Sequence, residues 1–195
     1  DEFIGWPSHT YSTAGKYTVT ATGMCMALMQ AQYEDGTFID TDLILSRLAW
    51  GDYINYSPAF ITQLIHIGKD MHLTNMINSF AYQTKLTEIP EGIFDGLKDV
   101  TTFDGTFAHC TNIMNIPEGL FDKCTEVNEF TFTFSSCTGL TNIPQGLFDN
   151  CTEVTGFNGT FATCTGLKSI PEGLFDNCTE VASFGDVFRQ CFALE

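Results

Sequence analysis

The stretch IPEGLFDNC, from Ile170 to Cys178, occurs four times in this chain with small changes. The other copies begin at Ile89, Ile116 and Ile143, so that each copy starts 27 residues after the previous one. A single motif with a proline, an acid and a cysteine would suit an active site. A motif repeated at a fixed spacing is more typical of architecture. The period of 27 residues lies within the range of leucine-rich repeats, which is about 20–29 residues.

Apolar residues outside this stretch keep the same period. Each repeat unit contains two halves that read F-x-x-C-x-x-[VL]-x-x-[FI]. This pattern predicts a coil with two walls, in which each FxxC segment is a tight helical turn or corner. Each [VL]xx[FI] segment is expected to be a short strand, and core residues should stack on their copies in the next coil. Two series are expected in the core: Phe107, Phe134, Phe161 and Phe188, and Phe103, Phe130, Phe157 and Phe184.

These motifs resemble the BspA-like leucine-rich repeats of bacterial surface proteins, in the branch that carries F-x-x-C-x-x-L-x-x-[IL] followed by F-D-x-x-x-x-V-x-x-[FM]. The resemblance covers roughly residues 59–195. It implies a leucine-rich-repeat-like solenoid of short β-strands joined by short helical turns. Upstream, HTYSTAGKYTVTATG (His9 to Gly23) resembles the closing strands of PKD-type modules. The segment LAWGDYI (Leu48 to Ile54) is similar to the segment that opens such arrays.

The expected organisation has three parts. Residues 1–54 form a small N-terminal β cap and the start of the array, 55–88 a degenerate first coil, and 89–195 the repeat solenoid. A cap is expected because the open end of a solenoid exposes its core and unpaired edges. The array stops partway through a coil at FRQCFALE, residues 188–195. We therefore expect a trimmed chain or a larger parent protein.

The charge of the chain excludes some partners. Eight basic and 24 acidic side chains give a formal net charge of −16. A surface this acidic repels phosphate backbones and anionic lipids, so neither nucleic acid nor a membrane surface is expected as a partner. No apolar run approaches the ~18 residues that a membrane-spanning helix needs, so membrane insertion is not expected.

The cysteines of the array favour a structural interpretation. Their spacings alternate between 14 and 13 residues, unlike the paired spacing of zinc ligands. Leu97 and Gln83 occupy equivalent positions, and a position that accepts leucine favours buried, reduced thiols. Disulfides between stacked coils and a metal site are the less favoured alternatives. The seven residues concerned are Cys110, Cys124, Cys137, Cys151, Cys164, Cys178 and Cys191.

Neither a cofactor nor an enzyme activity is expected. Asp95, Asp122, Asp149 and Asp176 form a series that could bridge calcium. Turn capping or solvent exposure is favoured, because a parallel glutamate series accepts Gln145. The four histidines do not combine with a cysteine, serine or acid in a catalytic pattern, and no nucleophile, base and orienting group recur together.

The repeat therefore predicts a non-catalytic binding or adhesion module. We expect it on a bacterial cell surface or secreted, or alternatively on a phage particle, where it recognises a host protein or a glycan. The alternative is a structural spacer or stalk in a larger protein. Solenoids present extended faces whose exposed residues vary while the core repeats. The variable pairs that follow the Val/Leu series are Thr87, Glu88, Met114, Asn115, Thr141, Asn142, Lys168 and Ser169.

Overall fold

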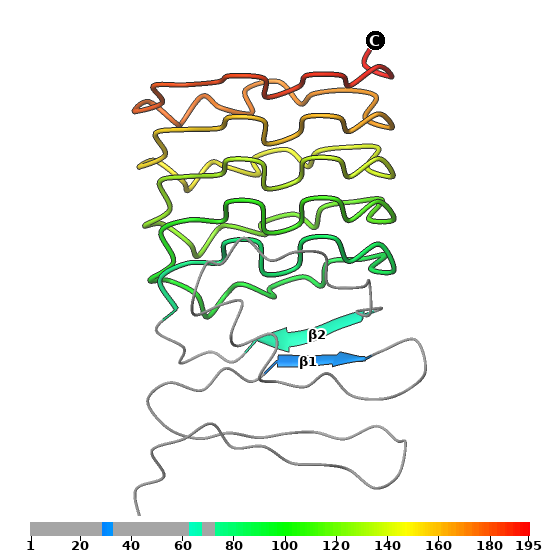
Figure 1. Cartoon of the computed structure of the whole chain (residues 1–195). Helices are drawn as coiled ribbons and strands as arrows, with labels where there is room; N and C mark the ends of the chain where they lie inside the picture. Colours follow the sequence, from blue (N-terminus) through cyan, green and yellow to red (C-terminus); the bar gives the residue numbers. More distant parts are fainter. Residues whose placement is uncertain (1–28, 33–62, 68–72) are drawn as a thin grey trace, which may run out of the picture.

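The computed structural model describes residues 29–32, 63–67 and 73–195. Strand β1 (Met29–Gln32) pairs antiparallel with β2 (Gln63–Ile67), with an irregularity between Gln30 and Ala31. Leu64 and Ile67 of β2 are buried in the same core cluster as the first coil, so β2 packs against one end of the array (Figure 1). The PKD-like segment 9–23 and the segment 48–54 lie outside the described residues.

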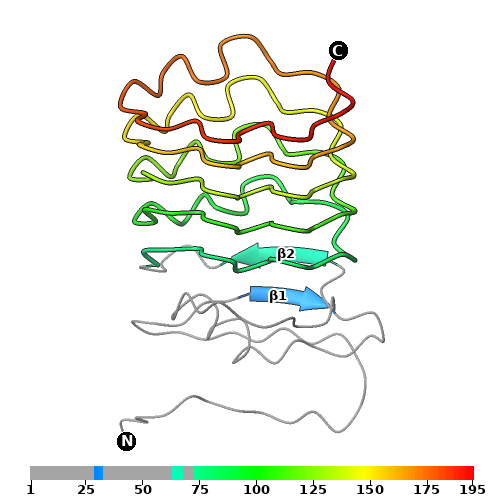
Figure 2. The same cartoon turned by 45° about the horizontal axis from the view of Figure 1, so that its top comes forward.

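From residue 73 onward the chain winds into coils that stack along one axis, as Figures 1 and 2 show. Single parallel bridges join equivalent residues of successive coils, in the order Asn75, Thr102, Glu129, Gly156 and Ser183. The fold is a leucine-rich-repeat solenoid, as the period predicts. We call the stacked segments 75–82, 102–109, 129–136, 156–163 and 183–190 the bridged wall.

The backbone of the bridged wall divides its hydrogen bonds between two directions. The N–H groups of Phe103, Gly105 and Phe107 donate to carbonyls of the next coil at 2.8–3.1 Å. The N–H groups of Thr106 and Ala108 turn back to carbonyls three residues earlier, and the Asp104 N–H donates to the Thr102 hydroxyl. Because only alternate amides donate to the next coil, successive coils in the described part of the array are joined by single bridges and not by continuous strands. The expected short strands and helical turns are replaced there by isolated bridges and tight turns.

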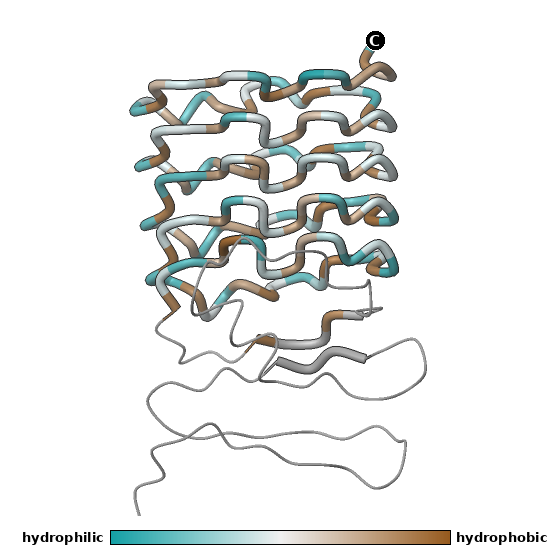
Figure 3. Tube along the Cα trace, in the orientation of Figure 1, coloured by the Kyte–Doolittle hydropathy of each residue, from teal (hydrophilic) through white to brown (hydrophobic). Residues whose placement is uncertain are grey.

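Stacked phenylalanine rings fill the space between the walls. Phe134 lies between Phe107 and Phe161, with ring centroids 5.5 and 5.6 Å away, and all three are fully buried. Apolar positions recur at the same places in every coil (Figure 3). The expected burial of the second series holds for Phe103, Phe130 and Phe157.

Phe184 is the exception in that series. Its ring is 45% exposed, although it still stacks on Phe157 at 5.8 Å. Phe184 and the half-buried Phe188 belong to the last coil, where no later segment of this chain covers their rings. The prediction of burial was therefore wrong for Phe184, because a stacking residue needs a neighbour on both sides.

The buried cysteines and threonines supply donors inside this core. The Cys137 thiol lies 3.2 Å from the carbonyl oxygen of Phe107, 30 residues earlier. The hydroxyl of Thr133 lies 2.8 Å from the carbonyl oxygen of Phe130 and 3.0 Å from that of Phe103, and it can donate to either. Cysteine suits its position because it packs as a small apolar side chain and still carries a weak donor. All seven array cysteines are buried and free, as the repeat predicts.

We expect these thiols to resist alkylation in the folded protein. Burial raises the pKa of Cys110 and Cys164 to about 12, and the thiolate is the reactive form. Iodoacetamide labelling at pH 7.5 with site mapping by mass spectrometry should leave Cys137 and Cys151 unmodified until denaturant is added. Cys178 and Cys191, which are 6% and 8% exposed, should react first. Rapid native labelling of Cys137, or a disulfide between coils, would contradict this expectation.

Candidate functional site

The eight residues predicted to form a binding face are largely exposed. Met114 is 57% exposed, and all the others are exposed except Thr141, which is half-buried. The structure aligns three of them in one row that runs across successive coils. The Thr141 N–H donates to the Met114 carbonyl at 3.1 Å, and the Lys168 N–H donates to the Thr141 carbonyl at 3.2 Å. We call the positions 87–88, 114–115, 141–142 and 168–169 the lateral face.

The acid series belongs to the turns. Gly92 has a φ of +64°, and the Oδ2 atom of Asp95 lies 2.9 Å from where a Cβ on Gly92 would be. The carboxylate therefore folds over a glycine that must take the left-handed region. The same arrangement recurs at the other three aspartates of the series. Within the described residues no three side chains from His, Cys, Asp and Glu gather in a way that could hold a metal ion.

The outer surface of the bridged wall carries a feature that the repeat pattern did not reveal. Several positions of each coil have a left-handed backbone, and one of them is occupied in turn by Asn78, Gly105, Phe132, Gly159 and Asp186. Asparagine, glycine and aspartate adopt this conformation readily, whereas a bulky side chain there is an outlier. Phe132, with a φ of 55°, is the one bulky side chain in this series, whereas a second left-handed position carries larger residues such as Tyr82 and His109.

The side chain at this position lies over the glycine of the following coil. A Cβ on Gly105 would collide with the Asn78 side chain, and one on Gly159 would collide with the Phe132 ring. One side of the Phe132 ring thus lies against Gly159, yet 52% of the residue stays exposed. The sequence signal was a Phe at a position that carries Asn, Gly, Gly and Asp in the other coils.

Two carboxylates contact Thr131, the residue before Phe132. The Thr131 N–H donates to Oδ1 of Asp104 at 2.8 Å, and the Thr131 hydroxyl lies 3.2 Å from Oε2 of Glu129. Burial raises the pKa of Asp104 and the nearby Glu129 raises it further, while hydrogen bonds from Thr102 and Thr131 oppose the shift. The two acids therefore form one half-buried acidic pair around Thr131, the residue before Phe132.

A second aromatic group lies at the edge of the same wall. The rings of Tyr82 and His109 stack with centroids 4.4 Å apart and planes 7° from parallel. Burial lowers the pKa of His109, so that the imidazole is neutral at pH 7. His109 thus adds an aromatic face to the wall without a positive charge.

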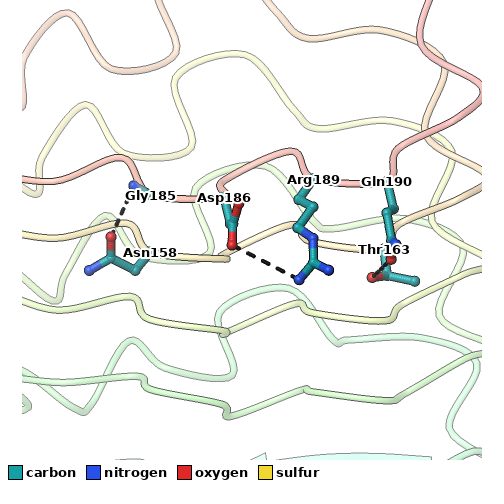
Figure 4. A network of polar contacts seen from close by, with 6 residues as sticks. All are labelled: Asn158, Thr163, Gly185, Asp186, Arg189 and Gln190. Atoms are coloured by element: carbon teal, nitrogen blue, oxygen red, sulfur yellow. Dashed lines mark hydrogen bonds and ion pairs between the residues drawn. The ribbon is translucent and has the colours of Figure 1, made fainter.

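The last two coils complete the wall with polar contacts (Figure 4). Oδ1 of Asn158 accepts the Gly185 N–H at 2.9 Å, which repeats the Asp104–Thr131 contact two coils earlier. Arg189 pairs with Asp186 at 4.0 Å on the surface. Asn158 thus shows that an amide replaces the carboxylate at this position with its backbone contact kept.

Comparisons with known proteins identify the repeat class. A family model described as "BspA type Leucine rich repeat region" matches residues 57–182 in six copies. No curated protein matches the chain. Across residues 29–32, 63–67 and 73–195, no helix has the length and apolar character to cross a bilayer.

Several solved structures are similar over part of the chain. The leucine-rich repeat domain of APL1 is 16% identical with a TM-score of 0.38, over 56% of this chain and 29% of that one. A leucine rich cell surface protein from Faecalibacterium prausnitzii A2-165 is 20% identical with a TM-score of 0.24, over 60% and 33%. A leucine-rich repeat protein from Eubacterium ventriosum is 18% identical with a TM-score of 0.30, over 60% and 33%. The match thus spans a third or less of the length of each of these structures.

Proposed function

Because the chain belongs to the BspA-type leucine-rich repeat family, we propose that it is a non-catalytic recognition module of a bacterial surface or secreted protein. Its ligand would be a host protein or a glycan. Leucine-rich repeat arrays generally serve as interaction modules, since stacked coils present a long surface of independent side chains. The observation that carries the proposal is the combination of an invariant core with exposed positions that change from coil to coil.

We propose the lateral face as a contact surface. Its residues have no role in the core, and backbone bonds hold Met114, Thr141 and Lys168 in one row. The Asn142 amide donates to the Thr141 hydroxyl at 3.0 Å, which orders the polar side chains on this face. A contact face of this kind suits a protein displayed at a cell surface, and one of the similar structures is that of a leucine rich cell surface protein from Faecalibacterium prausnitzii A2-165.

We expect replacement of Met114, Asn115, Thr141 and Asn142 together by alanine to weaken adhesion by at least tenfold. Four contact side chains each contribute a fraction of the binding free energy, and about 1.4 kcal/mol in total is a tenfold change. The measurement compares the variant with the unchanged protein in binding to host cells and to an array of glycans and host proteins.

The matched control replaces Lys123, Thr125, Asn150 and Thr152 by alanine. These residues are also exposed, and they form two equivalent pairs that lie one repeat apart, as the tested pairs do. The control should bind as the unchanged protein does. Unchanged adhesion of the lateral-face variant with an intact fold would remove the site from this face. Absence of any binding by the unchanged protein would instead favour a structural spacer.

A further inference from the structure

Phe132 places a large, half-exposed ring on the bridged wall, outside the packed core. A bulky residue in the left-handed region is strained, and its ring remains 52% exposed. The equivalent positions carry Asn78, Gly105, Gly159 and Asp186, which adopt that backbone more easily. A large exposed ring, at a position where the other coils carry small or polar residues, suits contact with a molecule outside the chain.

The charge around the ring indicates which kind of molecule. Asp104 and Glu129 both contact Thr131, the residue next to Phe132. In the described segments of the bridged wall the only Lys or Arg is Arg189, and it pairs with Asp186. The two carboxylates therefore have no cation of this wall beside them, on a chain whose net charge is −16.

We infer that the bridged wall binds a basic, extended segment of a partner protein, with a lysine or arginine side chain seated on the Phe132 ring beside Asp104 and Glu129. A cation is attracted to the ring face and to the carboxylates together. A neutral sugar could stack on the ring but would leave both carboxylates without a counter-charge. The neutral Tyr82–His109 pair offers a further stacking surface for an arginine on the same wall.

This inference rests on the proposed role as a recognition module and places a second contact on another wall. Two substitutions test it with the fold preserved. Phe132→Asn introduces the residue that Asn78 already places in this position. Asp104→Asn introduces the amide that Asn158 already uses there to accept a backbone N–H.

Matched controls exist for both changes. Phe192→Asn removes another exposed ring, which is 79% exposed and lies outside the bridged wall. Glu118→Gln removes one negative charge at an exposed position where the next unit already carries Gln145. Each control thus repeats the chemical change of its test variant away from the proposed site.

The probe is a ten-residue peptide of alternating lysine and threonine, measured against the full chain by fluorescence anisotropy at 150 mM salt. We expect Phe132→Asn to weaken binding about two- to fivefold, as loss of an exposed cation–π contact predicts. Asp104→Asn should weaken it to a similar extent and more than Glu118→Gln, while Phe192→Asn should have no effect.

Three results would overturn the inference. One is equal affinity of Phe132→Asn and the unchanged chain. Another is an equal loss from Glu118→Gln and Asp104→Asn, which would indicate attraction by net charge alone. The third is equal binding of an alternating serine–threonine peptide or a neutral oligosaccharide. The lateral-face variant should bind the basic peptide normally, so failure here leaves the adhesion test and the proposed function standing.

Discussion

Raising the pH from 9 to 10 should remove most or all of the stability of this repeat array. Burial keeps the thiols of Cys110, Cys124 and Cys164 protonated up to a pKa of about 12. Burial also holds the pKa of Cys137 and Cys151 far above the usual value of 9.0. In the unfolded chain these thiols ionise near pH 8.5–9.

The sign of the effect follows from proton binding. Between about pH 9 and pH 12 the folded chain holds more protons than the unfolded chain, so the free energy of unfolding falls as the pH rises. Below the unfolded pKa the contribution of the thiols is fully present. Each thiol contributes a slope of about 1.4 kcal/mol per pH unit. Five such thiols together give roughly 7 kcal/mol per pH unit, which is comparable to the whole stability of a typical domain.

The measurement is urea unfolding followed by circular dichroism between pH 7 and pH 10.5, with a reductant present. Cys124→Leu is the matched variant, because Leu97 occupies the equivalent position one unit earlier. In this variant the fall in unfolding free energy per pH unit should be smaller by the contribution of one proton. This holds whatever the effect of the substitution on stability at pH 7. A stability that is constant up to pH 10.5, or a slope of one proton or less, would show that the thiols titrate freely in the folded chain.

Phe134→Ala should lower the free energy of unfolding by about 3–5 kcal/mol, the usual range for a large buried ring. The ring is fully buried and stacks on both sides. Neighbouring coils cannot close around the cavity, because backbone bonds of 2.8 Å fix Phe107 and Phe134 to the coils that follow them. Urea unfolding with an unchanged m-value measures the effect.

Phe188→Ala provides the comparison within the same column of rings. Phe188 stacks on Phe161 at 5.6 Å but is half-buried in the last coil. Its loss should cost only about 1–2 kcal/mol, since less apolar surface returns to water. Equal losses from the two variants would mean that the last coil is covered in solution, and a negligible loss from Phe134→Ala would contradict the stacked core.

The sequence predicts the core well because each core residue meets its own copy. A residue such as Phe107 recurs after 27 positions, and its neighbours recur with it. Once the period is known, the residue that each core side chain packs against in the next coil is therefore known as well. The same logic identifies Cys137 and its equivalents as packing residues. It fails at Phe184, because the environment of the last coil differs from that of the others.

The local backbone was harder to predict from the pattern. The [VL]xx[FI] segments suggested strands, but the segment from Val100 to Phe103 forms only a single bridge, at Thr102. In the residues that follow it, alternate amides turn back within the coil, as those of Thr106 and Ala108 do. The direction of these amides depends on left-handed residues such as His109. The spacing of hydrophobic residues does not encode that backbone conformation. Phe132 was missed for a related reason, since averaging the repeat into a consensus hides the single position that departs from it.

The fixed spacing between bridged residues has a consequence for inheritance. Thr102, Glu129 and Gly156 bond to their equivalents at separations of 27 residues, and every coil offers the same two surfaces to its neighbours. A recombination event that deletes or duplicates 27 codons would therefore rejoin matching surfaces wherever it fell within the array. A lineage could lengthen or shorten this protein in whole coils without inventing a new interface. Losing or gaining a few codons would break the match at once.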